Sequence, residues 1–192
     1  MDGAAQDLHD LTVEAFDRFV DTEASGADFE LIDGEIVMMT NPTEAHEQLV
    51  ANIGAPLKLA MDKRGCRTYL GGMRVQADDD PRGRDKYIPD IVVRCGPRDD
   101  RRTFIVDPVV VVEVLSPSTM DNDRGPKLKF YELRASLGHI VLVYADQMRI
   151  EHYTRAGDVW RFEALTKPSD VLALDAVGFA IALEAVYFDL AL

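Results

Sequence analysis

The amino-acid sequence predicts an α+β fold in which a mixed β-sheet is flanked by helices and a β-meander lies near the C-terminus. Stretches 87–94 and 109–116 are almost wholly apolar, which is typical of strands buried on both faces of a sheet. Helical patterns come early, strands occupy the middle and hairpin signals come late, an order that favours α+β. The 192-residue length and 47% hydrophobic content fit one domain. We expect residues 1–192 to form that domain, with a helical segment at 1–27, a core with the site at 28–145, and a hairpin and C-terminal helix at 146–192.

Capping and turn residues predict the first elements. An amphipathic helix is expected over 10–20, with Thr12 as its N-cap, because a threonine hydroxyl can accept a free amide of the first turn. Asp33 and Gly34 stand between two alternating apolar runs, which is typical of a tight β-hairpin.

A long helix is expected to begin at Thr43, its predicted N-cap, and to reach Arg64, with Gly65 just past its end. Gly54 and Pro56 fall in its middle. Proline removes a backbone donor from a helix interior, so the sequence predicts a kink or break there.

Later elements follow from alternation and turn signals. A helix is expected from Pro126 to Gly138, after a turn-rich loop at 116–125, and a terminal helix is expected at 181–190. Further strands are expected at 66–70, 73–77, 139–144, 149–154, 159–163 and 171–174.

Two carboxylates interrupt the apolar strands, Asp90 in the first and Glu113 in the second. Burying an ionised carboxylate is costly unless a cation or a set of hydrogen-bond donors meets it. Two such groups on neighbouring strands therefore predict a shared cation. Mg²⁺ (or Mn²⁺) suits oxygen ligands and keeps waters for a phosphate substrate. The backbone carbonyl of Val114 is a candidate third ligand.

Lys127 is the candidate for stabilising charge or positioning a water, because it lies in the first helical turn after the Glu113 strand. Tyr131 lies on the same helix face and is expected to pack. Lys129 is the competing candidate for the catalytic lysine. Two other interpretations stay open: Glu113 forms a structural ion pair with Lys127 or an arginine, or Lys127 is merely solvated. His46 is, by composition alone, a surface or packing residue.

Composition limits the function classes. No apolar run approaches the ~20 residues of a membrane helix, and the acidic N-terminus is unlike a signal peptide, so we expect a cytoplasmic protein with no membrane partner. Cys66 and Cys95 lack metal-binding spacing and are expected to be reduced core residues, with a disulfide as the less favoured alternative. The formal net charge of −13 disfavours a nucleic-acid partner, although a local basic patch is compatible with it.

The motifs of the chain resemble those of a nuclease superfamily. Pro-Asp at 89–90, then Glu-Val-Leu-Ser-Pro-Ser-Thr at 113–119 and Asp-Arg-Gly-Pro-Lys-Leu-Lys-Phe-Tyr at 123–131, are its main carriers. They resemble the PD-(D/E)XK nucleases, and more narrowly the Uma-type family of restriction endonucleases. The resemblance covers nearly the whole chain.

This resemblance implies a restriction-endonuclease-like core with Asp90 and Glu113 as metal ligands. The superfamily's lysine, two residues after the glutamate, is Leu115 here. The Uma-type family shows the same departure and places a lysine on the following helix, which corresponds to Lys127. His46 matches a histidine typical of the family, which favours a place near the site and makes it a further catalytic candidate beside Asp90, Glu113 and Lys127.

We therefore expect a Mg²⁺-dependent endonuclease that hydrolyses phosphodiester bonds, with DNA as its substrate. The alternative is a catalytically silent nuclease-fold binding or regulatory module, which the acidic charge favours. A metal-dependent hydrolase of another phosphate ester is a third, weaker interpretation. Relatives in the superfamily often act as dimers. Tyr153, Trp160 and Phe162 could form the interface of a homodimer, but ordinary core packing is the favoured interpretation of these aromatic residues.

Overall fold

The structure is a computed structural model that describes residues 10–23, 26–115 and 123–191. Its helices and helical turns are α1 (Val13–Thr22), α2 (Glu44–Asp62), η1 (Asp123–Lys127), α4 (Leu128–Glu132), η2 (Asp175–Val177) and α5 (Leu183–Val186). Its strands are β1 (Phe29–Ile32), β2 (Glu35–Met38), β3 (Cys66–Leu70), β4 (Arg74–Gln76), β5 (Lys86–Tyr87), β6 (Ile91–Cys95), β7 (Phe104–Ile105), β8 (Val110–Leu115), β9 (His139–Tyr144), β10 (Ile150–Ala156), β11 (Val159–Leu165), β12 (Val171–Leu174) and β13 (Phe179–Ala182). In these ranges, no helix is both long and apolar enough to cross a membrane.

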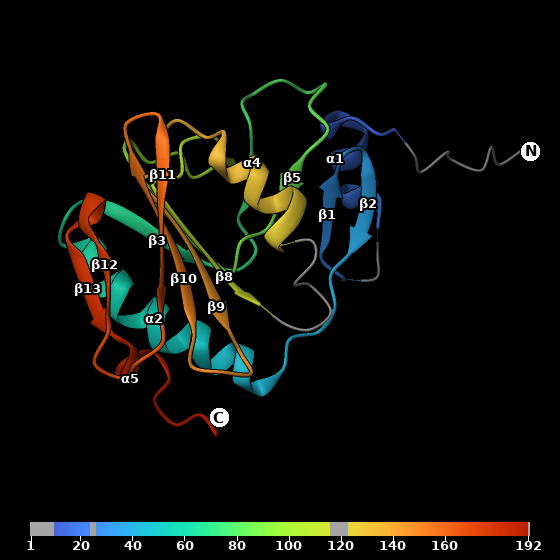
Figure 1. The fold of residues 1–192 in the computed structure, drawn as a ribbon. Helices are drawn as coiled ribbons and strands as arrows, with labels where there is room; N and C mark the ends of the chain where they lie inside the picture. Colours follow the sequence, from blue (N-terminus) through green and yellow to red (C-terminus); the bar gives the residue numbers. More distant parts are fainter. Residues whose placement is uncertain (1–9, 24–25, 116–122, 192) are drawn as a thin grey trace, which may run out of the picture.

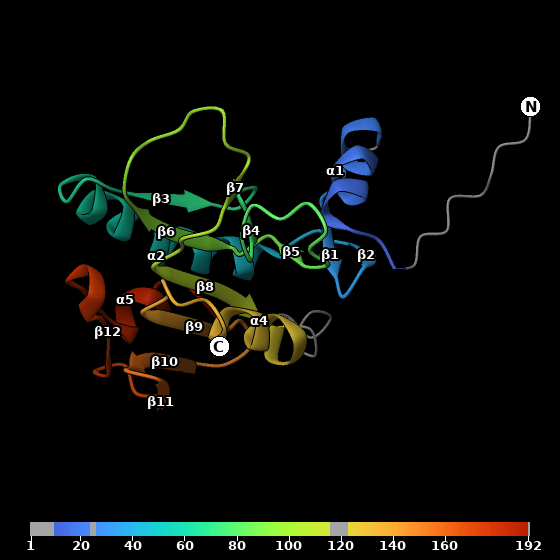
Figure 2. The same ribbon diagram turned by 90° about the horizontal axis from the view of Figure 1, so that it is seen from above.

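The described strands form three sheets. The largest has the order β11-β10-β9-β8-β6-β3, in which β8 and β9 are parallel and the other neighbours antiparallel. A second sheet has the order β2-β1-β5-β4-β7, and β12 pairs with β13. The α1, β1 and β2 segments stand together at one end of the molecule, while β12, β13 and α5 lie at the other (Figures 1 and 2). The predicted α+β class, with its mixed sheet and late meander, is confirmed.

Different helices cover the two faces of the largest sheet, because side chains alternate along each strand. Val112 and Val114 of β8 pack with α2 in one buried core. Val111 and Leu115 pack with α4 in the other. Glu113 shares the alternation of this second pair, so β8 directs its carboxylate toward α4.

The capping and turn predictions for the N-terminal part are confirmed. The hydroxyls of Thr12 and Thr43 each accept a first-turn amide, at the beginning of α1 and α2 respectively. The β1–β2 hairpin turns at Asp33 and Gly34, which both have the positive φ that the tightest hairpin turns require.

The predicted break in the long helix is wrong, since α2 runs without interruption through Gly54 and Pro56, whereas the alternative of a kink stays a prediction. Its buried face, which includes Leu49 and Leu57, packs on the central sheet, and this burial outweighs the local cost of the proline. Gly54 permits a close approach: a Cβ built there would lie 2.5 Å from a methyl carbon of Leu70.

The strand predicted at 87–94 is in fact two strands in different sheets. Strand β5 ends at Tyr87 and β6 begins at Ile91, with Pro89 between them. Proline cannot donate a hydrogen bond to a ladder, so pairing is interrupted here. Asp90 therefore lies just before β6 and not inside a continuous strand.

The helix predicted to reach Gly138 ends at Glu132. The guanidinium of Arg155, on β10, donates hydrogen bonds to the carbonyls of Glu132, Arg134 and Leu137. These carbonyls belong to the last residue of α4 and to the segment after it, and they have no partner within the helix. Their hydrogen bonds to Arg155 therefore stabilise the end of α4 at Glu132.

The predicted terminal helix is mostly absent. Its first residues belong to β13, which pairs with β12, and only Leu183–Val186 are helical. Phe179 and Ile181 of β13 pack against the core, so strand pairing accounts for part of the apolar pattern that suggested a helix. Residues 116–122 of the turn-rich loop predicted at 116–125 lie outside the described residues.

Cys66 and Cys95 form a disulfide, so the expectation of two reduced cysteines is wrong. They are register partners on the antiparallel strands β3 and β6, with Cα atoms 4.2 Å apart. Directly opposed residues on paired strands have neighbouring side chains, and this brings together two cysteines whose sequence separation is 29. The cytoplasmic location stays a prediction.

Candidate active site

A buried ammonium lies at the centre of the site. Lys127 Nζ lies 2.9 Å from Glu30 Oε1, 3.2 Å from Glu113 Oε2 and 3.4 Å from Asp123 Oδ1. Lys127 is only 2% exposed, and the three carboxylate residues are buried with it. The interpretation of Lys127 as a solvated lysine is therefore wrong, whereas its ion pair with Glu113 is present.

Three elements supply this carboxylate–lysine cluster (Glu30, Glu113, Asp123 and Lys127). Glu30 belongs to β1, Glu113 to β8, and the other two residues to η1, four residues apart. A carboxylate oxygen of Glu30 also accepts the amide of Ile88 at 2.7 Å. This bond holds the connection between β5 and β6 against β1.

Asp90 lies at the start of β6, beside the cluster. Its Oδ2 accepts the amide of Val114 at 2.6 Å, and its Oδ1 lies 3.1 Å from Nε2 of His46. The structure therefore brings His46 close to Asp90. The predicted role of the Val114 carbonyl stays a prediction.

The strand register relates the two predicted metal ligands. Ile91 of β6 pairs with Val112 of β8 in an antiparallel ladder. One residue beyond that pair, Asp90 stands opposite Glu113. The sequence predicted the two carboxylates on neighbouring strands. In the structure they occupy opposed positions where β6 begins beside β8.

Tyr131 contributes more than packing. Its hydroxyl donates a 2.7 Å hydrogen bond to Glu113 Oε1, so both oxygens of that carboxylate are bonded, one to Tyr131 and one to Lys127. The four-residue spacing between Lys127 and Tyr131 placed both on one helical face, as predicted.

The electrostatics reflect deep burial and an excess of carboxylates. Burial raises the pKa of Glu113 well above its usual range, even against the charge of Lys127. Burial lowers the pKa of Lys127, but the surrounding carboxylates outweigh it and raise that pKa well above its usual value. Burial also lowers the pKa of His46, and Asp90 outweighs it, so this pKa is raised. The site holds four carboxylates and one lysine, a combination that attracts further positive charge.

Access to Asp90 is through a cavity of about 220 Å³. His46, Leu70 and Gly71 line it together with Asp90. Lys129, the competing lysine, is exposed and lines a different cavity. The structure thus separates the two lysines: only Lys127 reaches the carboxylates.

Sequence reasoning missed Glu30. It is a carboxylate inside the apolar run Phe-Glu-Leu-Ile of β1, the same signal that identified Glu113. Applied to every strand, that signal would have found it. Asp123 carries no comparable signal, since it precedes a short helix in a polar stretch.

The late aromatic residues divide between core and surface. Tyr153 and Trp160 pack against the core beside α4, as favoured from the sequence. Phe162 is 55% exposed, so core packing is wrong for this residue. The homodimer stays a prediction.

Fold and site together define the class: an α+β protein with a restriction-endonuclease-like core. The structure has a TM-score of 0.74 with a crystal structure described as "a putative nuclease belonging to DUF820" from Anabaena variabilis. The match covers 92% of this chain and 97% of that one at 16% identity, and it concerns the fold alone. The chain belongs to the Uma2 family, whose model, described as "Putative restriction endonuclease", matches residues 13–184.

Two proteins from Synechocystis sp. (strain PCC 6803) are similar to this chain over most of its length. "Uncharacterized protein slr1290" is 30% identical over 163 residues, which cover 84% of each chain. "Uncharacterized protein sll1609" is 27% identical over 132 residues, covering 67% of this chain and 73% of its own. Family membership supports a nuclease-like hydrolase.

Proposed function

We propose that this chain is a Mg²⁺- or Mn²⁺-dependent endonuclease that hydrolyses phosphodiester bonds of DNA, with residues 1–192 acting as one nuclease domain. The observation that carries the proposal is the convergence of Asp90, Glu113 and Lys127 from separate elements, with 3.2 Å between Lys127 Nζ and Glu113 Oε2. Membership in the Uma2 family supports the nuclease class.

The donor set fits a hard divalent cation. In the described ranges, no group of three or more His, Cys, Asp and Glu side chains is arranged to hold a metal. Mg²⁺, however, is commonly bound by one or two carboxylates, with waters and substrate phosphates completing its shell. Asp90 and Glu113 would hold it, together with the carbonyl of Val114. When bound, the cation would polarise a phosphoryl oxygen and acidify a water.

The chain's own groups have separate roles in this proposal. Lys127 would place a positive charge next to the phosphate as negative charge develops in hydrolysis, and its burial strengthens that effect. Tyr131 fixes the orientation of Glu113, and His46 that of Asp90. His46 and Tyr131 are positioning residues, because each acts through a carboxylate.

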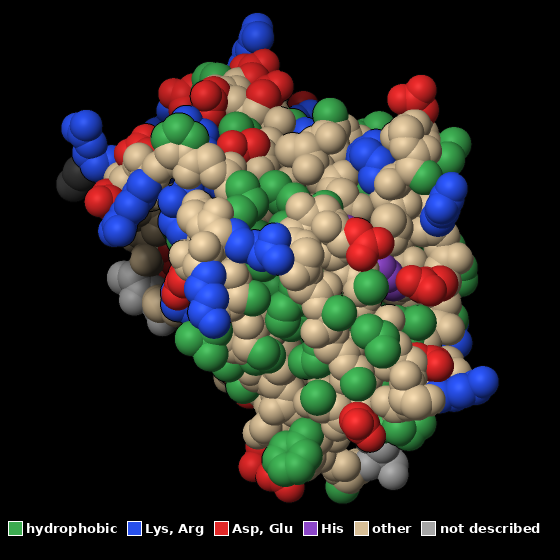
Figure 3. All heavy atoms as spheres, turned by 90° about the vertical axis from the view of Figure 1, so that its left-hand side faces the viewer, with side chains coloured by type: hydrophobic (Ala, Val, Ile, Leu, Met, Phe, Trp, Pro, Cys, Tyr) green, Lys and Arg blue, Asp and Glu red, His purple; other side chains and the backbone are tan. Residues whose placement is uncertain are grey.

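The net charge of −13 limits how DNA could approach. On the face in Figure 3, several Lys and Arg side chains lie toward one edge, with Asp and Glu side chains among them. Individual basic side chains can contact phosphates although the whole chain is acidic.

A second candidate function is a nuclease-fold binding or regulatory module without catalysis. The observation in its favour is that Lys127 and Glu113 are almost completely buried and already paired. In such a module the cluster would be a structural ion pair, and DNA cleavage would be absent.

Cleavage of supercoiled plasmid separates the two candidates. We expect nicking by the wild type with Mg²⁺ or Mn²⁺ and none with EDTA. Glu113→Gln and Lys127→Met should each lower the rate by about 10²-fold or more, while Lys58→Met, an exposed lysine on α2, should leave it unchanged. Unfolding curves establish that each variant is folded. If the folded wild type cuts neither duplex nor single-stranded DNA with either metal, the module is the better description.

A further inference from the structure

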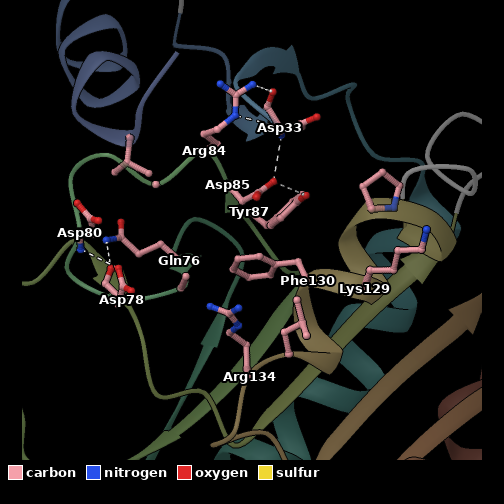
Figure 4. A pocket seen from close by; sticks show the side chains of 15 residues that line it. Asp33, Gln76, Asp78, Asp80, Arg84, Asp85, Tyr87, Lys129, Phe130 and Arg134 are labelled. Carbon is pink, nitrogen blue, oxygen red and sulfur yellow. Dashed lines mark hydrogen bonds and ion pairs between the residues drawn. The ribbon is translucent and has the colours of Figure 1, made fainter. Parts of the chain in front are cut away.

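A second cavity, of about 310 Å³, lies between the 76–87 segment and α4. Gln76, Phe130 and Arg134 all line this cavity; in Figure 4 Phe130 and Arg134 lie below Tyr87, and the amide end of Gln76 lies beside Asp78 and Asp80. Its volume is at the lower end for small-molecule sites, which suits a ligand built on one or two rings.

Two buried polar atoms at this cavity have no hydrogen-bond partner among the described residues. Gln76 is 3% exposed; its Nε2 donates to the carbonyl of Asp78, whereas its Oε1 is buried without a hydrogen bond. The Arg134 guanidinium lies 4.5 Å from the ring centroid of Phe130, and its buried Nε also has no partner. A buried polar atom without a partner is costly, so the cavity offers one acceptor and one donor to a ligand.

The carboxylates that line the cavity already have partners. Asp85 accepts hydrogen bonds from the Tyr87 hydroxyl and the Asp33 amide, and Asp33 also pairs with Arg84. Asp80 pairs with Arg82, and the carboxylate of Asp78 accepts the amide of Asp80. The interior is therefore suited to an uncharged ring that carries both donors and acceptors. Lys129, exposed among the lining residues, is the group available to an attached phosphate.

The same short helix serves the cavity and the carboxylate–lysine cluster. Lys129 and Phe130 line the cavity, whereas Lys127 and Tyr131 contact Glu113. The ring of Tyr87 lies between, with its centroid 6.0 Å from Lys127 Nζ. A ligand here would lie one aromatic side chain away from the proposed catalytic groups.

We propose that this cavity binds one nucleotide unit, with its base bonded to Gln76 Oε1 and the Arg134 guanidinium and its phosphate near Lys129. Nucleobases carry exocyclic or ring N–H donors beside ring acceptors, and arginine both stacks on bases and donates to them. The unit comes either from a single strand or from a free nucleotide. The first source rests on the proposed nuclease function, and the second does not.

Calorimetry in EDTA tests this proposal without requiring cleavage. The probes are the four deoxynucleoside monophosphates, deoxyribose phosphate and a short single-stranded DNA oligonucleotide. We expect at least one monophosphate to bind, and deoxyribose phosphate to bind far more weakly. Gln76→Met and Arg134→Met should each weaken binding roughly tenfold or more. Gln48→Met on α2 and Arg161→Met on β11 are the matched controls. Lys129→Ala, an exposed change that leaves the fold intact, should weaken binding several-fold, and Lys167→Ala should not.

The outcomes are separable from those of the plasmid assay. If oligonucleotide binding weakens in the same cavity variants, the nucleotide comes from a strand; if only monophosphate binding weakens, it is free. Monophosphate binding without plasmid cleavage would contradict the nuclease function and leave the nucleotide site standing. No binding of any monophosphate to the wild type, or equal binding to folded Gln76→Met, Arg134→Met and Lys129→Ala, would overturn the site.

Discussion

At the residue scale, Lys127 is the cation that the buried carboxylates of the cluster share. Its ammonium has three carboxylates within 3.4 Å and little contact with water. A buried ion pair can contribute little net stability, yet removing one partner leaves the others as uncompensated buried charge. The same residue is thus expected to support both the fold and the proposed chemistry.

Replacing Lys127 by methionine should therefore destabilise the fold. With EDTA present, so that no metal compensates, we expect Lys127→Met to lower the free energy of unfolding by about 3–5 kcal/mol in urea titrations. The matched change at exposed Lys58 should cost less than about 1 kcal/mol. Equal unfolding midpoints for the two variants would contradict the assignment of Lys127 as the counterion of the buried carboxylates.

At the element scale, a chain of hydrogen bonds links β9, β10 and β11. The amide of Ala176 donates to His139 Nε2, and His139 Nδ1 lies 2.9 Å from His152 Nε2. His152 Nδ1 lies 2.9 Å from Glu163 Oε1. With His139 accepting at Nε2, its proton lies on Nδ1 and points to His152, whose own proton then points to Glu163. This order requires both imidazoles to be neutral.

Stability should therefore fall in mild acid. Burial, with the neighbouring His152, lowers the pKa of His139 from 6.5 to about 4, and burial lowers that of His152 although Glu163 and Asp175 oppose it. Below about pH 6.5 the unfolded chain takes up protons that the folded chain does not, so stability is lost as pH falls toward 4. For His139 alone the loss is at most about 3 kcal/mol.

The change in unfolding free energy between neutral pH and about pH 4 measures this effect. His139→Gln, which removes the titrating group, should show a smaller loss than the wild type, because carboxylates titrate alike in both. An identical pH dependence would show that His139 is not kept neutral by the fold.

At the scale of the whole molecule, the disulfide ties the edge strand β3 to β6, which leads from Asp90 into the central sheet. It closes the loop between two cysteines whose sequence separation is 29, and this loop contains β4 and β5 of the second sheet. The bond therefore restricts the conformations that this loop can adopt in the unfolded chain.

Reduction should accordingly destabilise the oxidised protein. We expect a loss of about 2–4 kcal/mol, measured as the shift of urea unfolding on addition of a reductant. The Cys66→Ser, Cys95→Ser double variant should unfold like the reduced protein and should not respond to reductant. Two titratable thiols in the denatured, unreduced wild type would contradict the disulfide.

Much of the fold follows from local chemistry. The caps at Thr12 and Thr43, the Asp33-Gly34 turn and the strands β8 to β12 depend on nearest-neighbour turns, side-chain alternation and local burial patterns. Asp90 and Glu113 could be identified from the sequence because an ionisable residue is unusual in an apolar stretch. Lys127 followed from its spacing within the helix and from the family resemblance.

Only the tertiary structure decided the remaining features. Helix α4 ends at Glu132 because Arg155 binds the carbonyls there, and α2 stays continuous because it packs on the central sheet. The disulfide forms because β3 and β6, which are distant in sequence, pair in a register that opposes the two cysteines. Glu30 joins the cluster because β1 packs beside the β5–β6 connection. The sequence by itself thus determined the fold class and which residues are unusual. Their partners were decided by contacts between distant segments, whose free energies exceed local preferences.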